Sequence, residues 1–312
     1  METFKKSIKT KFPFLIPIIK CVRAFIKSIY RLVQLIILPV KIRFNLPEKR
    51  PHKLIRFEVH LTDHCNLNCA SCTHFSPLAE PSFVNIDTFR RDFIRMGKLF
   101  SHKCEWIHLL GGEPLLNPDV IELMKIAREN FSDGDIQIVT NGILLPQQDE
   151  KFWRACHDNN IQVRMTLYPI KIDIDKIKKL AEDFDVDFNY YGPKTGRNEF
   201  TKMPLDLSGK GSAIMNFFMC WLGNRCMILR EGKLFTCTTM PHVFLFNKAF
   251  NQNIPVTEAD YIDIYSDITP KEILRRLAKH IPACSYCNIR KHKAKASRIK
   301  WQLSKRKISE WV

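Results

Sequence analysis

Short apolar runs alternate with amphipathic stretches between residues 56 and 191. Continuous apolar runs are typical of buried strands, whereas apolar residues at steps of three and four are typical of helices. The pattern predicts strands at Arg56–Thr62, Trp106–Leu110, Ile136–Thr140, Ile161–Leu167 and Val186–Tyr191. It predicts helices at Ile86–Phe100 with Asp87 as N-terminal cap, Pro118–Asn130, Asp149–Asn159 and Asp173–Asp183. Such strand–helix repetition predicts an α/β fold with a parallel sheet and right-handed crossovers.

Residues that could bind a cofactor or take part in a reaction follow four of these strands directly. Cys65 comes after the first strand, Gly111–Glu113 after the second, Asn141 after the third and Tyr168–Pro169 after the fourth. The carboxyl ends of parallel strands meet at one edge of the sheet, where α/β folds carry their sites. We therefore expect these residues to share one site.

The pattern changes after residue 200. A two-stranded hairpin is expected to turn at Glu231–Gly232, followed by a strand at Tyr261–Ser266 and a helix at Lys271–Lys279. The predicted organisation is a basic N-terminal segment (1–50), an α/β part (56–200), a cysteine-rich module (201–290) and a basic C-terminal tail (291–312).

Residues 12–40 are strongly apolar, but charges interrupt them before any run reaches the roughly 20 residues that span a bilayer. Polar residues recur at steps that place them on one helical face: Lys20, Arg23, Lys27, Arg31 and Gln34. Such a helix suits an anionic membrane surface, which would place the chain in the cytoplasm, peripherally at the inner face of the cell membrane. The alternative is a helix that docks on the protein itself with its basic stripe in water.

Composition adds that the charge is segregated. The chain is 45% hydrophobic and 26% charged, which is typical of globular proteins and excludes a disordered chain. The net charge of the chain is +17. Residues 1–56 contain 14 Lys and Arg against 2 Asp and Glu, and residues 284–312 contain 9 Lys and Arg against 1 Glu. The basic ends favour anionic partners. The tail is expected either to form a basic amphipathic helix at the membrane or to be solvated.

Eleven cysteines are present, and a secretory signal is not expected because Lys and Arg interrupt the N-terminal apolar runs. In a reducing cytoplasm, clustered thiols indicate metal ligands rather than disulfides. Cys65, Cys69 and Cys72 can supply three ligands to a cubane iron–sulfur cluster and leave its fourth iron open. A zinc site completed by His64 or His74 is the alternative.

The run Cys65-Asn66-Leu67-Asn68-Cys69-Ala70-Ser71-Cys72, placed after the first strand, resembles the signature of the radical S-adenosylmethionine (SAM) superfamily. The resemblance implies a partial (β/α)6 TIM-like barrel and a 4Fe–4S cluster on Cys65, Cys69 and Cys72, with SAM chelated at the open iron. Many relatives carry an aromatic residue at the position of Ser71. The adenine is then expected to pack elsewhere, and Phe75 is a candidate.

Two further motifs extend the resemblance. Gly111-Gly112-Glu113-Pro114 looks like the superfamily's GGEP motif, in which the glycines let the backbone approach the SAM amino group and Glu113 accepts from it. Asn141 is similar to a position from which relatives contact SAM.

The later cysteines resemble the auxiliary-cluster extensions called twitch and SPASM. Cys220, Gly232, Cys237 and the pair Cys284 and Cys287 have the matching spacing. No cysteine follows Cys287, so one auxiliary 4Fe–4S cluster is expected, with Cys226 or Cys220 as its fourth ligand. A zinc knuckle on four of these thiols is the alternative.

The resemblance implies an enzyme that cleaves SAM to a 5′-deoxyadenosyl radical, with flavodoxin or ferredoxin as electron donor. A sugar, nucleotide sugar or lipid-linked glycan is the expected substrate, because the overall texture is similar to polysaccharide-associated radical SAM proteins. Modification of a peptide or protein side chain is the alternative. A non-catalytic metal or nucleic-acid binding protein would need aromatics among its basic residues, and the tail offers only Trp301 and Trp311.

Overall fold

The computed structural model describes residues 21–22, 25–26, 28–29, 53–192, 196–289 and 298–312. The chain forms two compact units, residues 1–50 and residues 51–312. In the first unit the described residues are helical, and the apolar side chains among them are exposed: Val22, Phe25, Ile26 and Ile29. The rest of the predicted amphipathic helix lies outside the described residues. In the described ranges, no helix combines the length and the apolarity that crossing a bilayer requires.

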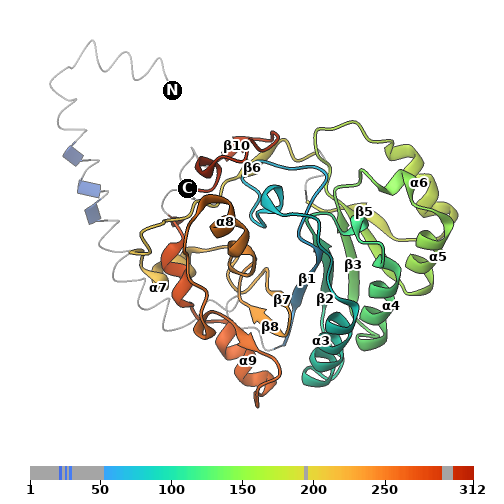
Figure 1. Cartoon of the computed structure of the whole chain (residues 1–312), viewed down its shortest axis with the longest axis horizontal. Coiled ribbons are helices and arrows are strands. Elements are labelled where there is room, and N and C mark those ends of the chain that lie inside the picture. Colours follow the sequence, from blue (N-terminus) through green and yellow to red (C-terminus); the bar gives the residue numbers. More distant parts are fainter. Residues whose placement is uncertain (1–20, 23–24, 27, 30–52, 193–195, 290–297) are drawn as a thin grey trace, which may run out of the picture. The chain divides into compact units, whose positions relative to one another are not determined.

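An eight-stranded sheet forms the centre of the second unit, in the order β5-β4-β3-β2-β1-β7-β8-β9 (Figure 1). Neighbouring strands from β1 to β5 are parallel. Their bounds are β1 Arg56–Thr62, β2 Trp106–Gly111, β3 Asp135–Thr140, β4 Ile161–Met165 and β5 Phe188–Tyr190. All five lie where the apolar runs predicted strands.

Four helices follow the first four strands and pack on the sheet: α3 Ile86–Leu99, α4 Val120–Asn130, α5 Glu150–Asp158 and α6 Ile174–Asp183. The main core lies between these helices and the strands, where Phe93 of α3 contacts the rings of Phe57 and Phe131. The prediction of Asp87 as cap of the first helix is wrong. Asn85 is the cap, and its side chain accepts from the Thr88 N–H at 2.9 Å.

The remaining strands of the sheet come from the cysteine-rich part: β7 Ile228–Arg230, β8 Lys233–Phe235 and β9 Ile262–Asp263. β7 pairs in parallel with β1 and turns into antiparallel β8. Glu231 and Gly232 both have positive φ, 49° and 75°, as a tight hairpin turn with the right-handed twist requires. This part also contains the helices α7 Ala213–Met219, α8 Val243–Phe250 and α9 Pro270–Leu277.

The predicted class, an α/β partial barrel, is confirmed by this parallel-rich sheet. Six neighbouring strands are parallel, because β7 continues the parallel part of the sheet beyond β1. After β5 the chain leaves the sheet and forms β6, Glu199–Thr201, which pairs with β10, Arg298–Lys300.

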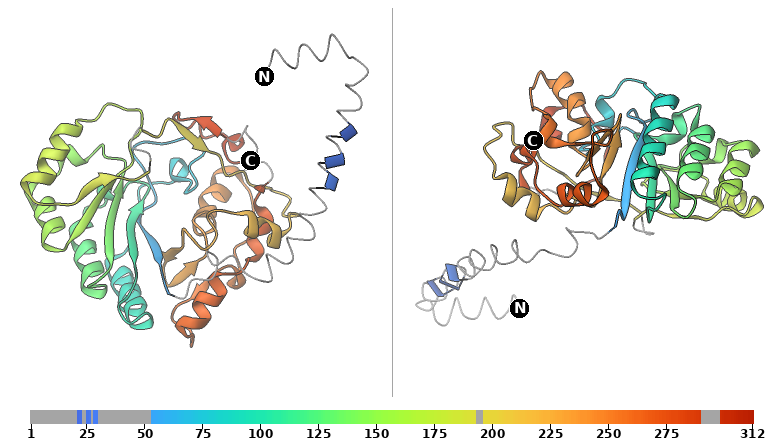
Figure 2. Two further views of the ribbon diagram at one scale, coloured as in Figure 1. Left: turned by 180° about the vertical axis from the view of Figure 1, so that it is seen from behind. Right: turned by 90° about the horizontal axis from the view of Figure 1, so that it is seen from below.

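The C-terminal segment packs against the body of the protein (Figures 1 and 2). Trp311 is 2% exposed and belongs to a second core with Phe75, Phe246 and other buried residues. The regular structure in the described part of the C-terminal segment is β10 and a short 3-10 turn at Ile308–Glu310. The expectation of a solvated tail or a basic helix is therefore wrong for residues 298–312.

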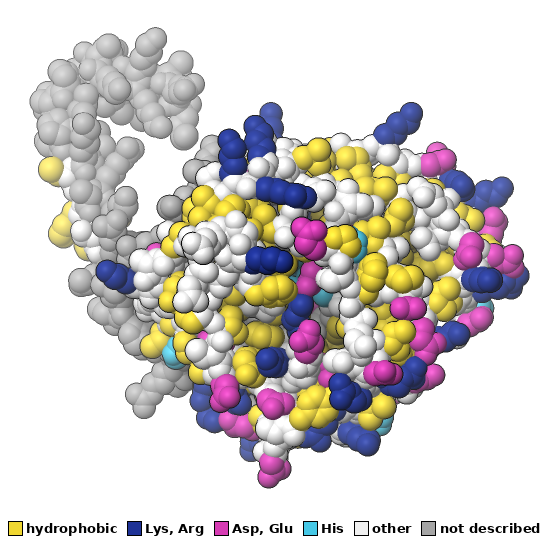
Figure 3. Space-filling view, viewed as in Figure 1, with side chains coloured by type: hydrophobic (Ala, Val, Ile, Leu, Met, Phe, Trp, Pro, Cys, Tyr) yellow, Lys and Arg dark blue, Asp and Glu magenta, His cyan; other side chains and the backbone are white. Residues whose placement is uncertain are grey.

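Over the side of the molecule formed by α3–α6, Lys and Arg side chains alternate with Asp and Glu on the face shown in Figure 3. This agrees with the near balance of residues 57–283, which carry 26 Lys and Arg against 29 Asp and Glu. The excess positive charge of the sequence lies at its ends.

Candidate functional site

The three triad cysteines line one cavity at the carboxyl ends of β1, β2 and β3. The wall of this cavity includes residues from each strand end that the sequence singled out: Cys65, Cys69, Cys72, Gly111, Gly112, Thr140, Asn141 and Tyr168. The predicted convergence of these strand ends on one site is thus present in the fold.

Burial dominates the acid–base state of the triad. It raises the pKa of Cys65 and of Cys69 to about 12, and it raises the pKa of Cys72 as well. Each thiol therefore keeps its proton at neutral pH until a metal displaces it. These side chains are suited to hold metal rather than to act as free nucleophiles.

Gly111 and Gly112 bring the end of β2 against the start of the cysteine loop. A Cβ on Gly111 would lie 2.2 Å from the Thr62 carbonyl oxygen, and a Cβ on Gly112 would lie 2.0 Å from that of His64. The Gly112 N–H donates to Thr62 at 2.9 Å, and the Glu113 N–H donates to His64 at 3.1 Å. The two glycines are thus required by contact between two chain segments, whatever else approaches them.

Glu113 lies behind the cavity wall and is fully buried. Its carboxylate accepts from the Thr140 hydroxyl at 2.6 Å, the Asn141 N–H at 2.8 Å and the Leu115 N–H at 3.2 Å. Burial raises its pKa to about 7. The predicted contact of Glu113 with SAM stays a prediction, since the structure shows its side chain holding Asn141. Pro114 is also buried and outside the cavity wall.

Asn141 joins the third strand end to the cysteine loop. Its amide donates to the Asn66 side-chain oxygen at 2.7 Å and lies 3.7 Å from the Cys65 sulfur. Its own oxygen accepts from the Ile143 N–H at 3.0 Å. The residue is therefore fixed beside the first ligand cysteine.

The C-terminal segment covers the other side of this loop. The Trp301 indole N–H donates to the Cys69 sulfur at 3.1 Å, and the Trp311 indole donates to the Cys72 carbonyl at 2.8 Å. The Ser71 hydroxyl donates to the backbone of Glu310 at 2.8 Å. No motif in the sequence predicts these contacts, and the one signal for them is the pair of tryptophans, Trp301 and Trp311, in an otherwise basic tail.

Phe75 does not take the place of the aromatic residue missing at position 71. It is 1% exposed and packs in the second core against Phe246 and Trp311. The aromatic residues that line the cavity are Tyr168, Tyr191 and Trp221.

The later cysteines form a second group. Burial, reinforced by neighbouring thiols, raises the pKa of Cys237 to about 11 and that of Cys284 to about 12. Cys220 acts electrostatically on Cys237, Cys284 and Cys287 alike. The Asn216 amide ties the last two together by donating to the Cys284 and Cys287 carbonyls at 2.8 and 2.7 Å.

Cys226 contributes to the wall of the triad cavity and is also coupled to the second group. After burial, Glu58, Cys237 and Cys220 all raise its pKa. The choice between Cys220 and Cys226 as the fourth ligand of the second group stays a prediction.

Zinc and iron–sulfur sites differ in the spacing of their sulfur ligands. Thiolates around one tetrahedral zinc lie about 3.8 Å apart, given zinc–sulfur bonds of about 2.3 Å, whereas the ligands of a cubane bind iron atoms at separate corners. Among the described residues, no three cysteine sulfurs lie within 4.8 Å of one another. The assignment of both cysteine groups to iron–sulfur clusters stays a prediction.

Residues 59–168 match the model of the Radical SAM superfamily. Over these residues, this chain is similar to the radical SAM superfamily. Members use a 4Fe–4S cluster and SAM, so the predicted cofactors are confirmed at the level of the family. The matched range contains the triad, the Gly111–Pro114 motif and Asn141, whose roles stay predictions. The twitch-like extension lies outside it and also stays a prediction.

Several relatives are GTP 3′,8-cyclases. That of Sulfurovum sp. (strain NBC37-1) is 31% identical over 93 residues, which cover 30% of this chain and 28% of the cyclase. That of Pasteurella multocida (strain Pm70) is 24% identical over 195 residues, 59% and 54% of the two chains. The chain thus spans between less than a third and about half of these relatives.

Two solved structures are also similar. BtrN in complex with AdoMet and 2-DOIA has a TM-score of 0.47 at 15% identity, covering 75% of this chain and 93% of BtrN. Streptococcus suis SuiB bound to the precursor peptide SuiA has a TM-score of 0.34 at 13% identity, covering 63% and 62%.

Proposed function

We propose that this protein is an enzyme in which SAM, bound at a 4Fe–4S cluster, is reductively cleaved to a 5′-deoxyadenosyl radical that removes hydrogen from a substrate. The observation that carries the proposal is the single cavity. Its wall combines the three triad cysteines with groups suited to an organic substrate, among them Glu58, Tyr191 and Trp221.

In this proposal Cys65, Cys69 and Cys72 hold the cluster. Gly111, Gly112 and Asn141 line the SAM side of the cavity. The Glu113 carboxylate keeps Asn141 in place through its backbone N–H. The C-terminal segment excludes water from the outer face of the loop.

A second 4Fe–4S cluster is proposed on Cys220, Cys237, Cys284 and Cys287. The support is the electrostatic influence of Cys220 on the other three thiols, which it exerts on Cys226 as well, and the Asn216 amide that joins Cys284 to Cys287. Cys226 is assigned to the cavity wall. Flavodoxin or ferredoxin is the proposed class of electron donor.

The proposed substrate is a sugar, a nucleotide sugar or a lipid-linked glycan. Glu58 is 3% exposed and lies between Arg56, at 3.9 Å, and His108, at 3.3 Å. With Tyr191 and Trp221 this wall offers hydrogen-bonding groups beside aromatic surface, which is the combination that a ring bearing several hydroxyls requires. A peptide side chain is the second candidate, because the cavity wall also reaches the surface at Trp221, which is 50% exposed.

Attachment to an anionic membrane surface is proposed for the N-terminal segment. Its described residues are helical, and Val22, Phe25, Ile26 and Ile29 recur at steps of three and four with their side chains exposed. An apolar face next to Lys and Arg residues suits the bilayer interface. Flotation of the full chain with anionic liposomes, compared with a chain lacking residues 1–45, tests this: equal binding by both would contradict it.

The deciding experiment is anaerobic reconstitution of the full chain with iron and sulfide. Two clusters predict about eight irons per chain. Reduction in the presence of SAM is expected to release 5′-deoxyadenosine, measured by mass spectrometry. Cys65→Ala should lose about four irons and all 5′-deoxyadenosine formation.

Cys104→Ala is the matched control, because Cys104 is also buried but lies in the main core away from the cavity. It should retain both iron and SAM cleavage. Zinc without iron, or iron without SAM cleavage, would contradict the proposed function. Deuterium transfer from labelled nucleotide sugars or peptides into 5′-deoxyadenosine separates the two substrate classes.

A further inference from the structure

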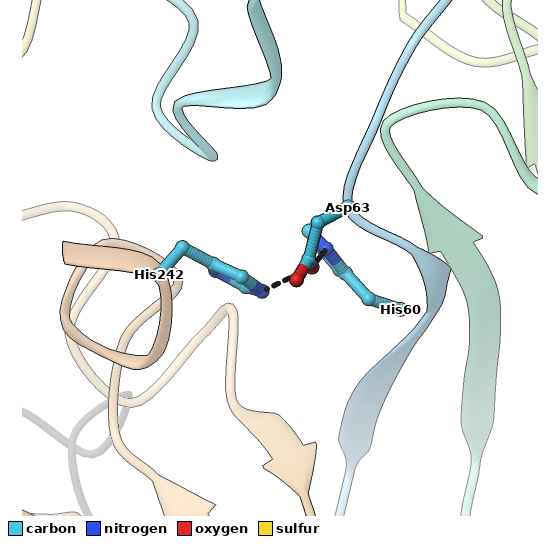
Figure 4. A group of neighbouring side chains, drawn as sticks. All are labelled: His60, Asp63 and His242. Carbon is cyan, nitrogen blue, oxygen red and sulfur yellow. Dashed lines mark hydrogen bonds and ion pairs between the residues drawn. The ribbon is translucent and has the colours of Figure 1, made fainter. Parts of the chain in front are cut away.

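A buried cluster of imidazoles surrounds one carboxylate beside the cysteine loop. Asp63 precedes the loop, His60 lies on β1, and His242 comes from the turn before α8 (Figure 4). One potential ligand atom from each of the three lies within 4.8 Å of the other two. Their side chains are 3%, 7% and 0% exposed for His60, Asp63 and His242. None of the three belongs to either cysteine group.

The tautomer of His242 is fixed by the backbone. Its Nδ1 lies 2.9 Å from the Thr238 carbonyl oxygen, which can only accept, so Nδ1 carries the proton. The lone pair of Nε2 then faces the Asp63 carboxylate at 3.5 Å. Two hydrogen-bond acceptors, His242 Nε2 and the Asp63 carboxylate, thus face each other in a buried place without a proton between them. A cation bound between them would stabilise this arrangement.

Protonation of His242 would be one resolution, but its surroundings oppose it. Burial lowers the pKa of His242 well below its usual value, and neighbouring His60 lowers it further. Burial likewise lowers the pKa of His60 to about 4.

We propose that His60, Asp63 and His242 bind a divalent transition-metal ion, distinct from the two iron–sulfur clusters. The donor set of two imidazoles and one carboxylate is that of catalytic zinc and non-haem iron sites. His60 Nδ1 forms a 2.9 Å hydrogen bond with Asp63 Oδ1, which the ion would replace, and the same oxygen lies 3.5 Å from His242 Nε2. The Thr238 carbonyl is the outer partner that orients a ligating imidazole.

Arg230 is the competing cation. Its guanidinium lies 3.0 and 2.9 Å from the two oxygens of Asp63, and its side chain is 26% exposed. Because Arg230 contacts Oδ1 as well as Oδ2, an ion on Oδ1 has to displace the guanidinium from that oxygen and is repelled by its charge. The positive charge of the divalent ion and Arg230 together exceeds the negative charge of the Asp63 carboxylate. An anionic oxygen is therefore expected in the open coordination position.

The metal ion and the anionic oxygen can both reach this site from solvent. His60, Asp63 and Arg230 line a cavity of about 210 Å³ that is separate from the one containing the cysteine triad. Three protein ligands and an open position toward a cavity are typical of catalytic rather than structural metal sites. The cavity also provides the entry path that a metal site requires.

Zinc is the probe for the test. The reconstituted full-length protein is incubated with one equivalent of Zn²⁺ and desalted, and its metals are measured by mass spectrometry and zinc X-ray absorption. One zinc per chain is expected, with nitrogen and oxygen neighbours at about 2.0–2.1 Å and no sulfur at about 2.3 Å. His242→Gln should bind zinc at least tenfold more weakly with unchanged iron content. His157→Gln, at an exposed histidine of α5, should equal the wild type.

Arg230→Met provides a test that does not depend on a buried substitution. Removing the competing cation at the cavity edge should increase zinc affinity at least tenfold. Zinc bound through sulfur, equal binding by His242→Gln and the wild type, or no gain in Arg230→Met would each overturn the proposal. Iron content and SAM cleavage report separately on the proposed function, so the failure of either proposal is recognised without the other.

Discussion

The hydrogen bond from Trp301 to the Cys69 sulfur is expected to set the reduction potential of the first cluster. Reduction adds negative charge to the cluster and its thiolates, and a donor aimed at one sulfur stabilises the reduced state more than the oxidised state. The 3.1 Å distance and the burial of Cys69 make this a strong contact. Hydrogen bonds to charged groups contribute about 1.5–3 kcal/mol.

Trp301→Phe removes the donor while keeping an aromatic ring. If one-electron reduction strengthens the bond by about 1 kcal/mol, its loss lowers the midpoint potential by about 40 mV, since about 59 mV corresponds to a tenfold change. Potentiometric titration followed by electron paramagnetic resonance measures this. The first cluster is identified as the one whose signal changes when SAM is added.

Trp311→Phe is the matched control, because its indole donates to the Cys72 carbonyl rather than to sulfur. It should weaken packing of the tail and leave the potential of the first cluster within about 10 mV of the wild type, far below the change expected for a lost donor to sulfur. Equal potentials in Trp301→Phe and the wild type would refute the reasoning. An equal shift in both tryptophan variants would refute it too, because loosening of the tail would then be the cause.

Three further predictions concern the protein that surrounds the site. Gly112→Ala should abolish iron binding at the first cluster, because the new Cβ would lie 2.0 Å from the His64 carbonyl; retention of about eight irons would contradict this. Phe93→Ala should lower the free energy of unfolding by about 3–5 kcal/mol in urea titrations, against less than about 1 kcal/mol for the 38% exposed Ile94→Ala. Glu113 has its pKa raised to about 7 by burial, so its contribution to stability is full below about pH 4.5 and is lost as pH rises through 7, by about 3 kcal/mol. Glu113→Gln should remove that part of the pH dependence, and an unchanged profile would disprove the assignment.

The strands and helices of the α/β part could be predicted closely, because each shows the pattern of apolar and polar residues typical of its type. Arg56–Thr62 is a strand with the predicted bounds, and the hairpin at Glu231–Gly232 turns where expected. Errors occurred where local signals compete. Asn85 and Asp87 are both good caps in isolation, and the position of the first helical turn decides between them.

The candidate site was predictable only as far as its motifs are local. The spacing of Cys65, Cys69 and Cys72 is contained in eight residues, and the strand rule brings Asn141 to them. His60 and Asp63 lie in a strand and its continuation, where they have no periodic signal. Their partner His242 is almost 180 residues away in sequence, so only the fold could show that the three meet.

The C-terminal segment shows the same limit more sharply. Its charge favours a surface or a membrane. Five Lys, Arg or His residues lie between Asn288 and β10, in a short stretch that the structure does not describe: Arg290, Lys291, His292, Lys293 and Lys295. What decides its position is a different set of interactions. The backbone of Ala70 donates to Gln302, and that of Ser304 donates to Asn68, each at 2.8–2.9 Å.

 

Backbone pairing of this kind carries no signature in side-chain composition, because every residue except proline has the same donor and acceptor. The basic side chains of residues 298–312 can therefore stay at the surface while the backbone and the two indoles bind the cysteine loop. A tail that looks like a membrane or nucleic-acid segment by charge alone is, by its contacts, part of the structure around the cysteine loop.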